Sequence, residues 1–261
     1  MMKAMLAAAV AVFVIYGAQS AYAQRGQFAE NPEEDNRPEP PGKQGAPIDV
    51  TGFWVSIVTE DWRFRMLTPR KGDYPGLPIN RAARQVAGGW DPAQDEAAGE
   101  ECKAYGAPAI MRVPGRVHIT WQDDNTLEIE TDAGEQTRLI HFGKADAPAG
   151  EPSRQGNSRG VWESLQRFDY GRGMPPLNGS LKVTTTRLKP GYLRKNGVPY
   201  SADTSVTEYF DLVREPNGAQ YLIVKTIVED PVYLTQPFIT SSNFKKQDGR
   251  AGWDPKPCAA R

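Results

Sequence analysis

Glu208 is the residue of this chain best placed for acid–base chemistry. A three-residue turn at Pro216-Asn217-Gly218 pairs two alternating segments and sets Glu208 opposite Thr226, on a face otherwise made of Val, Phe and Leu. Burial disfavours the charged form of a carboxylate unless it is paired, so such a group is a candidate for proton transfer. The alternative is a structural Glu bonded to Arg63, Arg65 or a tyrosine inside the fold.

Charged and aromatic residues alternate along residues 60–66, EDWRFRM. Continued as a strand, this segment places Arg63 and Arg65 on one face and Glu60 and Trp62 on the other. With the arginine face inward, two guanidinium groups would bind a carboxylate, sulfate or phosphate. With the aromatic face inward, Glu60 becomes a second buried acid. The third interpretation is a charged outer surface on an edge strand.

His118 and Glu130 have the composition of a base and the carboxylate that orients it. Hairpin turns at 123–125 and at 133–135 predict that His118, Glu130 and Arg138 form one row across three strands. His118 is therefore the second candidate for proton transfer. A solvated charged face is the alternative, because opposite charges on neighbouring strands are common there.

Aromatic residues offer a further kind of site. Trp162, Glu163 and Tyr209 are candidates for binding a sugar or an aromatic ligand by stacking, although such rings also form protein cores. His141 falls on the predicted apolar face. No phosphate loop, dinucleotide fingerprint, nucleophile elbow or cluster of metal ligands occurs, so we expect no metal site and no cofactor.

The elements that position these residues are mainly strands. Alternating segments and short turns recur from residue 50 to residue 58 and from residue 116 onward, and predict about nine or ten strands. The segment from about residue 78 to residue 105 is different: Asn80 and Asp91 are residues of the type that caps the start of a helix, so short helices are predicted there. We expect an antiparallel, barrel-like sheet of the lipocalin or calycin kind with a short helical insert.

The ends of the chain predict export. Residues 1–23 have a basic start, an apolar stretch and an Ala-Tyr-Ala cleavage site, as in a signal peptide. Residues 24–47 are a Pro- and Glu-rich tail without enough apolar residues to fold, which leaves 48–261 as one domain. In an oxidising compartment Cys102 and Cys258 pair most simply as one disulfide. The expected location is periplasmic or secreted.

Two resemblances accompany this pattern. Gly52-Phe53-Trp54 resembles the G-x-W start of lipocalins, in which the Trp closes one barrel end against a late Arg or Lys. The chain is also similar to a large group of uncharacterised exported bacterial proteins. The shared motifs are Trp90-Asp91-Pro92 before Cys102, Gly160-Val161-Trp162-Glu163, Thr207-Glu208-Tyr209 and Glu229-Asp230-Pro231. This resemblance implies export and a β architecture, and it implies no particular reaction.

Three functions are compatible with these features. The first is a barrel-like protein that binds a small amphipathic or anionic molecule in its lumen. The second is a cofactor-free lyase, isomerase or hydrolase that uses a buried Glu, and the third is a cell-envelope interaction protein. The chain has 31 basic and 32 acidic residues, so it has no excess of positive charge. This balance argues against nucleic acid or an anionic membrane as its main partner. No stable membrane anchor is expected after signal cleavage.

Overall fold

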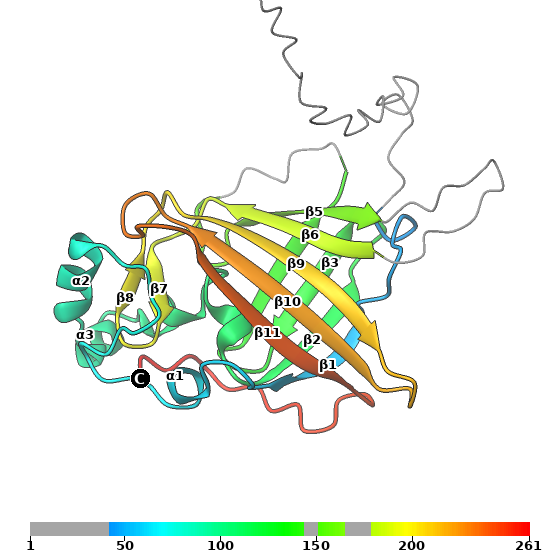
Figure 1. The fold of residues 1–261 in the computed structure, drawn as a ribbon, viewed down its shortest axis with the longest axis horizontal. Coiled ribbons are helices and arrows are strands. Elements are labelled where there is room, and N and C mark those ends of the chain that lie inside the picture. Colours follow the sequence, from blue (N-terminus) through cyan, green and yellow to red (C-terminus); the bar gives the residue numbers. More distant parts are fainter. Residues whose placement is uncertain (1–41, 144–150, 165–178) are drawn as a thin grey trace, which may run out of the picture. The chain divides into compact units, whose positions relative to one another are not determined.

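The protein is a nine-stranded closed β-barrel with a few short helices (Figure 1). A computed structural model describes residues 42–143, 151–164 and 179–261, so the predicted signal peptide and most of the predicted tail lie outside the described residues. The barrel order is β1-β11-β10-β9-β6-β5-β4-β3-β2. The barrel strands are β1 (Gly52–Ile57), β2 (Arg116–Trp121), β3 (Thr126–Thr131), β4 (Gln136–His141), β5 (Asn157–Ser164), β6 (Gly179–Thr186), β9 (Ser205–Arg214), β10 (Gln220–Glu229) and β11 (Phe238–Gln247).

The predicted mainly-β barrel is thus confirmed, with one difference in strand direction. All neighbouring barrel strands run antiparallel except β4 and β5, which are parallel. Antiparallel neighbours can be joined by a tight hairpin, whereas parallel neighbours need a longer connection, and residues 142–156 provide one.

Most of the side chains buried in the barrel are apolar. The largest fully buried residues include Trp54, Phe210 and Phe244, which belong to one cluster with the inward residues of the other strands. Trp54 donates its Nε1 hydrogen to the carbonyl of Val50 (3.0 Å), and the Nζ atom of Lys246 lies 4.4 Å from the centre of its ring. The contact between an early Trp and a late cation, which the G-x-W resemblance implies, is therefore present.

The β9–β10 register agrees with the prediction. Phe210 pairs with Val224 and Glu208 with Thr226, and the Glu215 N–H donates to the carbonyl of Ala219 (2.8 Å). The sequence Pro-Asn-Gly defines this turn unambiguously, so every inward residue of the hairpin is placed correctly.

The β3–β4 register differs from the prediction by one residue. Thr131 pairs with Gln136, so the turn contains four residues instead of three, and Ile129 lies opposite Arg138. A one-residue shift exchanges the two faces of a strand. Arg138 therefore points into the barrel, while His141, predicted on the apolar face, is half-buried on the other side of β4.

The continuation of β1 through residues 59–66 as a strand was wrong. β1 ends at Ile57, Asp61 adopts a left-handed conformation (φ 49°), and the chain turns into the short helix α1 (Trp62–Met66). The pairing of β1 with β11 ends at Ile57 opposite Asn243, although β11 itself extends to Phe238, because the turn at Asp61 takes the chain out of the extended conformation.

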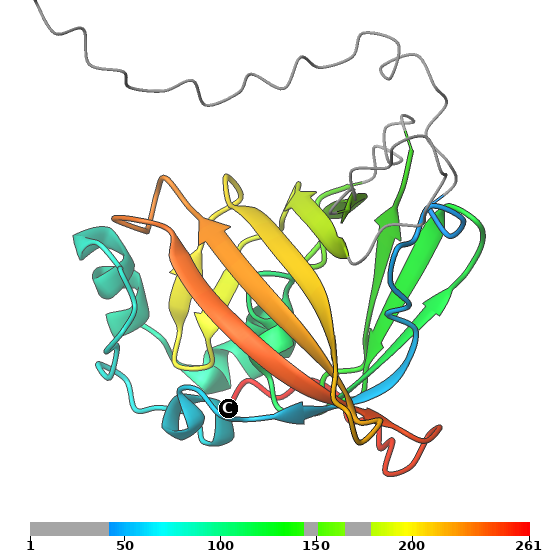
Figure 2. The same cartoon turned by 45° about the vertical axis from the view of Figure 1, so that its right-hand side comes forward.

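The helical insert lies at one end of the barrel, as Figures 1 and 2 show. Its helices are α2 (Arg81–Gly88), α3 (Pro92–Ala97), and the 3₁₀ turns η1 (Glu101–Tyr105) and η2 (Ile110–Arg112). The Asn80 side chain caps α2 and the Asp91 side chain caps α3, as predicted. Ala83 and Ala87 of α2 share an apolar cluster with the hairpin of β7 (Gly191–Arg194) and β8 (Val198–Tyr200).

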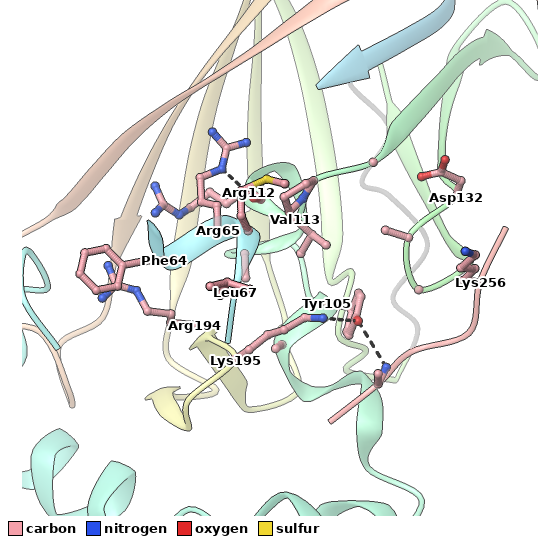
Figure 3. A pocket seen from close by; sticks show the side chains of 18 of the residues that line it. Phe64, Arg65, Leu67, Tyr105, Arg112, Val113, Asp132, Arg194, Lys195 and Lys256 are labelled. Carbon is pink, nitrogen blue, oxygen red and sulfur yellow. Dashed lines mark hydrogen bonds between the residues drawn. The ribbon is translucent and has the colours of Figure 1, made fainter. Parts of the chain in front are cut away.

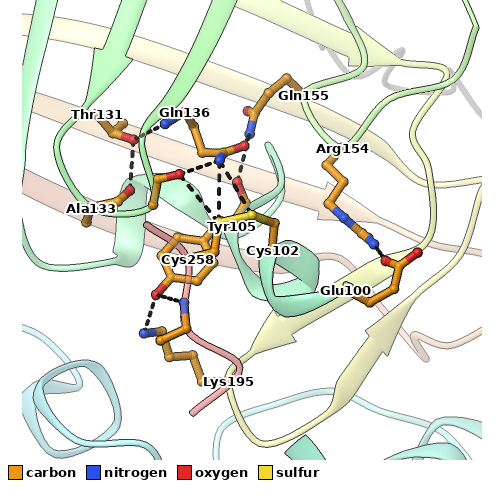
Figure 4. The surroundings of a disulfide bond; sticks show 12 residues. Glu100, Cys102, Tyr105, Thr131, Ala133, Gln136, Arg154, Gln155, Lys195 and Cys258 are labelled. Carbon is orange, nitrogen blue, oxygen red and sulfur yellow. Dashed lines mark hydrogen bonds and ion pairs between the residues drawn. A yellow bond between two sulfur atoms is a disulfide. The ribbon is translucent and has the colours of Figure 1, made fainter. Parts of the chain in front are cut away.

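The predicted disulfide is present. Cys102 of η1 is bonded to Cys258, which lies 156 residues later in the C-terminal segment (Figure 4). The same segment is attached to the β3–β4 turn by backbone bonds between Lys256 and Asp132 (2.8 Å) and between Gly134 and Lys256 (2.8 Å). The end of the chain is therefore held against the barrel, beside η1.

Candidate ligand-binding site

A pocket of about 490 Å³ lies at the barrel end where η1 and the C-terminal segment meet (Figure 3). Its volume is in the range usual for small-molecule sites. Distant parts of the chain line it: α1, η1, the connection from η2 to β2, the β3–β4 turn, the β7–β8 turn and residues 254–259. A site built from so many segments forms only when the whole domain is folded.

Basic side chains predominate in the lining. The pocket contains two carboxylates, Asp132 and Asp254, against six basic groups. These are Arg65, Arg112, Arg116, Arg194, Lys195 and Lys256. The excess of positive charge suits an anionic ligand.

Arg65 is the arginine that α1 supplies to this pocket. It is buried, and its Nε donates to the backbone carbonyl of Arg112 (2.8 Å). Neither terminal nitrogen has a hydrogen-bond partner in the part of the chain that the structure describes. Burial, and then the nearby charge of Arg112, lower the pKa of Arg65.

Arg194, at the end of β7, is the second buried arginine. It is 6% exposed, and its guanidinium group lies over the Phe64 ring, 4.5 Å from the centre. One terminal nitrogen donates to the carbonyl of Pro75 (3.2 Å), and among the described residues the other has no partner. Burial, with the charge of Arg112, lowers the pKa of Arg194 to about 10.

Arg112 of η2 completes the group and is the one of the three with a carboxylate partner. Its Nη2 lies 2.9 Å from Oδ2 of Asp61. The positive charge of Arg112 disfavours the charged forms of both Arg65 and Arg194. A second anion in this place would offset that repulsion and would give the unpartnered guanidinium nitrogens an acceptor. This arrangement is suited to binding a carboxylate, sulfate or phosphate group.

Another wall of the pocket is formed around Tyr105, next to the disulfide (Figures 3 and 4). The Tyr105 hydroxyl oxygen accepts hydrogen bonds from Lys195 Nζ (2.7 Å) and from the backbone N–H of Ala259 (3.3 Å). Gln155 donates to the backbone carbonyl of Tyr105 (2.8 Å). These contacts fix the ring and join the β7–β8 turn to the C-terminal segment.

The rim of the pocket is apolar on the α1 side. Met66 and Leu67 line the pocket and yet are 57% and 70% exposed. Val113 and Leu193 add further apolar surface. A ligand with an anionic head and a short apolar tail would match this combination of arginines and aliphatic side chains.

The structure places only one of the proposed residues of α1 in this pocket. Arg65 lines it, whereas Arg63 forms an ion pair with Asp73 (2.9 Å) and its side chain is 66% exposed. Glu60 and Trp62 are exposed as well. Because the segment is a helix and not a strand, Arg63 and Arg65 do not share a face.

Glu208 lies in the barrel interior, away from the pocket. It is fully buried, and its Oε2 is 2.6 Å from Nη2 of Arg138. Arg138 also donates to the hydroxyls of Ser158 (2.9 Å) and Thr185 (2.6 Å). The partner of Glu208 is therefore the arginine that the predicted register had placed outside, and the pair belongs to the packed interior.

His118 and Glu130 form the predicted cross-strand pair on the outside of the barrel. Nδ1 of His118 lies 2.8 Å from Oε2 of Glu130, and its ring is stacked on Phe53 with centroids 4.1 Å apart. Trp253 meets both rings edge-on. Because Glu208 faces the interior and His118 faces outward, the structure does not bring these two candidates to one substrate.

The three residues of the proposed stacking site do not face one common site in the structure. Trp162 is partly buried, is stacked on Phe142 and donates to the carbonyl of Gly42 (2.6 Å). Glu163 pairs with Lys182 (3.1 Å), whose ammonium lies 5.7 Å from the centre of the Tyr209 ring. Trp162 thus contributes to the core, whereas Glu163 and Tyr209 belong to the outer surface.

Arg112, Arg194 and Lys195 were not predicted as site residues. The sequence held only an indirect signal: Arg194 and Lys195 directly precede Asn196-Gly197, a pair of residues typical of a tight turn. Their convergence on Arg65 depends on tertiary contacts between segments that have no fixed spacing in the sequence.

Among residues 42–143, 151–164 and 179–261, no three His, Cys, Asp or Glu side chains are grouped as they would be to hold a metal ion. In the same ranges, no helix has the length and apolar character needed to cross a membrane. Comparison with known proteins found no matching family model, no matching curated protein and no matching solved structure.

Proposed function

We propose that this protein is an exported binding protein for a small amphipathic anion, and that the ligand occupies the pocket at the barrel end. The interior of the barrel, which the sequence had favoured as the binding site, holds buried apolar side chains such as Trp54 and Phe244 together with the ion pair of Glu208 and Arg138. The proposal therefore moves the ligand from the lumen to the pocket outside it.

One observation supports this proposal above the others. Arg65 and Arg194 are buried beside Arg112, and three terminal guanidinium nitrogens of Arg65 and Arg194 lack a partner among the described residues. Burying cations close to one another destabilises the folded protein, and folding alone gives no reason for such an arrangement. A bound anionic ligand offsets the destabilisation, so ligand binding gives a reason for placing these arginines together.

Isothermal titration calorimetry with decanoate, decyl sulfate and decanol tests the proposal. All three share an apolar chain, and only the first two are anionic. We expect both anions to bind at least tenfold more tightly than decanol, because a charge-assisted hydrogen bond contributes about 1.5–3 kcal/mol. Equal affinity for decanol and decanoate would contradict the proposal.

The helix α1 offers a matched pair of variants. Arg65→Gln removes a lining cation and should weaken decanoate binding by about tenfold or more. Arg63→Gln removes an exposed arginine of the same helix outside the lining and should change the affinity less than twofold. If both variants weaken binding equally, the assignment of the pocket is wrong. Circular dichroism establishes that each variant is folded.

A further inference from the structure

Three large apolar side chains are exposed together on and just after α1. Trp62 is 64%, Met66 57% and Leu67 70% exposed. Trp62 and Met66 are four residues apart in the helix and share one of its faces. We call these three residues the apolar lip. Soluble domains rarely leave such a group in water unless it has a partner.

The apolar lip is bordered by positive charge. Phe64–Leu67 line the arginine-rich pocket, and the exposed residues Arg70 and Lys71 follow α1 in the chain. Of the neighbouring carboxylates, Asp61 is paired with Arg112 and Asp73 with Arg63, while Glu60 at the start of the segment is exposed. The local balance is positive although the whole chain is near neutral.

We propose that the apolar lip docks reversibly on a membrane surface of anionic phospholipids. Trp62, Met66 and Leu67 enter the boundary between headgroups and acyl chains, and the basic residues around them face the lipid phosphates. Trp is favoured at that boundary, since its ring is apolar and its N–H needs a polar partner. Attraction to anionic lipids adds to the burial of the apolar side chains.

The size of the patch favours a membrane over a protein partner. A stable protein interface buries roughly 800 Å² on each partner, with about 20–30 residues on each side. Three side chains on and just after one short helix fall far short of that area, whereas a short apolar insertion is sufficient for reversible binding to a membrane. The inference stands apart from the proposed binding of a soluble anion, which needs the arginines of the pocket and not Trp62.

Vesicle co-sedimentation provides the test. The protein is purified after export, with its mass checked, so that the apolar segment 4–17 is absent. It is mixed with vesicles of phosphatidylcholine alone or of phosphatidylcholine with phosphatidylglycerol. We expect at least tenfold tighter binding to the mixed vesicles, and a steep loss of binding when salt is raised, because surface charges are screened.

Variants identify the surface that binds. The triple variant Trp62→Ser, Met66→Ser, Leu67→Ser should lose at least tenfold in vesicle affinity. The single variant Trp62→Ser changes no residue of the pocket lining, so it should lose part of the vesicle affinity and should bind soluble decanoate as the unchanged protein does. Ile239→Ser changes a residue of β11 that is 60% exposed and should bind vesicles as the unchanged protein does. Brominated lipids should quench tryptophan fluorescence in the Ile239→Ser protein and much less in the triple variant.

Three results would overturn the inference. They are an absence of binding to either vesicle, binding that the triple variant retains, and self-association without vesicles that the triple variant abolishes. Failure of decanoate binding with vesicle binding intact would instead count against the proposed function alone.

Discussion

At the scale of single residues, Glu208 and Arg138 form an ion pair buried inside the barrel. Both side chains are buried among the apolar residues of the interior, and the ion pair is supported by hydroxyls of Ser158 and Thr185. Removing one partner from such a pair leaves an uncompensated charge, whereas replacing both by apolar groups is often neutral or stabilising.

We expect Arg138→Met to lower the free energy of unfolding by about 3–5 kcal/mol, because Glu208 then stays buried without a partner. The double variant Arg138→Met, Glu208→Leu should recover most of that loss. Urea denaturation of the single and double variants measures the coupling. Additive losses would show that the two side chains do not depend on each other.

The lowered pKa of Arg194 predicts how ligand binding depends on pH. Burial lowers this pKa to about 10, and an anion is bound by the charged guanidinium. The contribution of Arg194 is therefore complete below about pH 9 and is lost as the pH rises through 10, by at most tenfold in affinity per pH unit.

The control for this effect is Arg194→Gln, because lysines also lose their charge near this pH. Decanoate affinity of the two proteins, measured by calorimetry from pH 7 to pH 11 with the fold checked by circular dichroism, should differ at neutral pH and converge at high pH. A ratio that stays constant across the range would contradict the assigned role of Arg194.

At the scale of elements, the β3–β4 turn connects the barrel to the pocket. Gly134 has φ 81°, and a Cβ added there would lie 2.3 Å from the Tyr105 ring. Gly218 in the β9–β10 turn has a similar φ of 86°, and a Cβ there would meet nothing within 4 Å. The two glycines thus share a backbone conformation and differ in their surroundings.

Gly134→Ala should consequently destabilise the protein more than Gly218→Ala. Both variants bear the cost of a left-handed alanine, about 1 kcal/mol, and the first also displaces Tyr105, for a further loss of about 1–3 kcal/mol. Thermal melting measures the difference, and decanoate binding should weaken only in Gly134→Ala. Equal melting temperatures would show that the Tyr105 ring moves without cost.

The same two turns explain how far the sequence could predict the fold. Pro216-Asn217-Gly218 allows one short turn, so the β9–β10 register and the burial of Glu208 followed from the sequence. Between β3 and β4, Asp132-Ala133-Gly134-Glu135 allows a turn of three or four residues, and the wrong choice placed Arg138 outside. Register errors of this kind exchange whole faces, so they affect site predictions more than fold predictions.

The pocket itself was predictable only in part. Arg65 was predicted as a lining residue from a segment read as a strand, and it lines the pocket from a helix, since the alternation in residues 60–66 is short enough to suit either element. Its partners Arg112 and Arg194 come from a 3₁₀ turn and a hairpin whose positions depend on the folded barrel.

At the scale of the whole molecule, the disulfide holds the last residues of the chain in the wall of the pocket. Replacing both Cys102 and Cys258 by Ser should lower the free energy of unfolding by about 3–5 kcal/mol, as the chain-entropy model predicts for a long loop. It should also increase hydrogen exchange at residues 254–259 and weaken decanoate binding. Urea denaturation and exchange mass spectrometry measure these effects, and an unchanged pocket would show that the backbone bonds of Lys256 suffice.

The pairing of β1 with β11 has a consequence for biosynthesis. Phe53 of β1 pairs with Gln247 of β11. One edge of β1 therefore stays unpaired until almost the entire chain has been synthesised. Contacts so distant in sequence slow folding, and unpaired strand edges promote aggregation in the meantime. A chain that stops before β11 would keep two such edges permanently. Truncations that remove residues 238–261 should therefore yield aggregated protein and not a smaller soluble barrel.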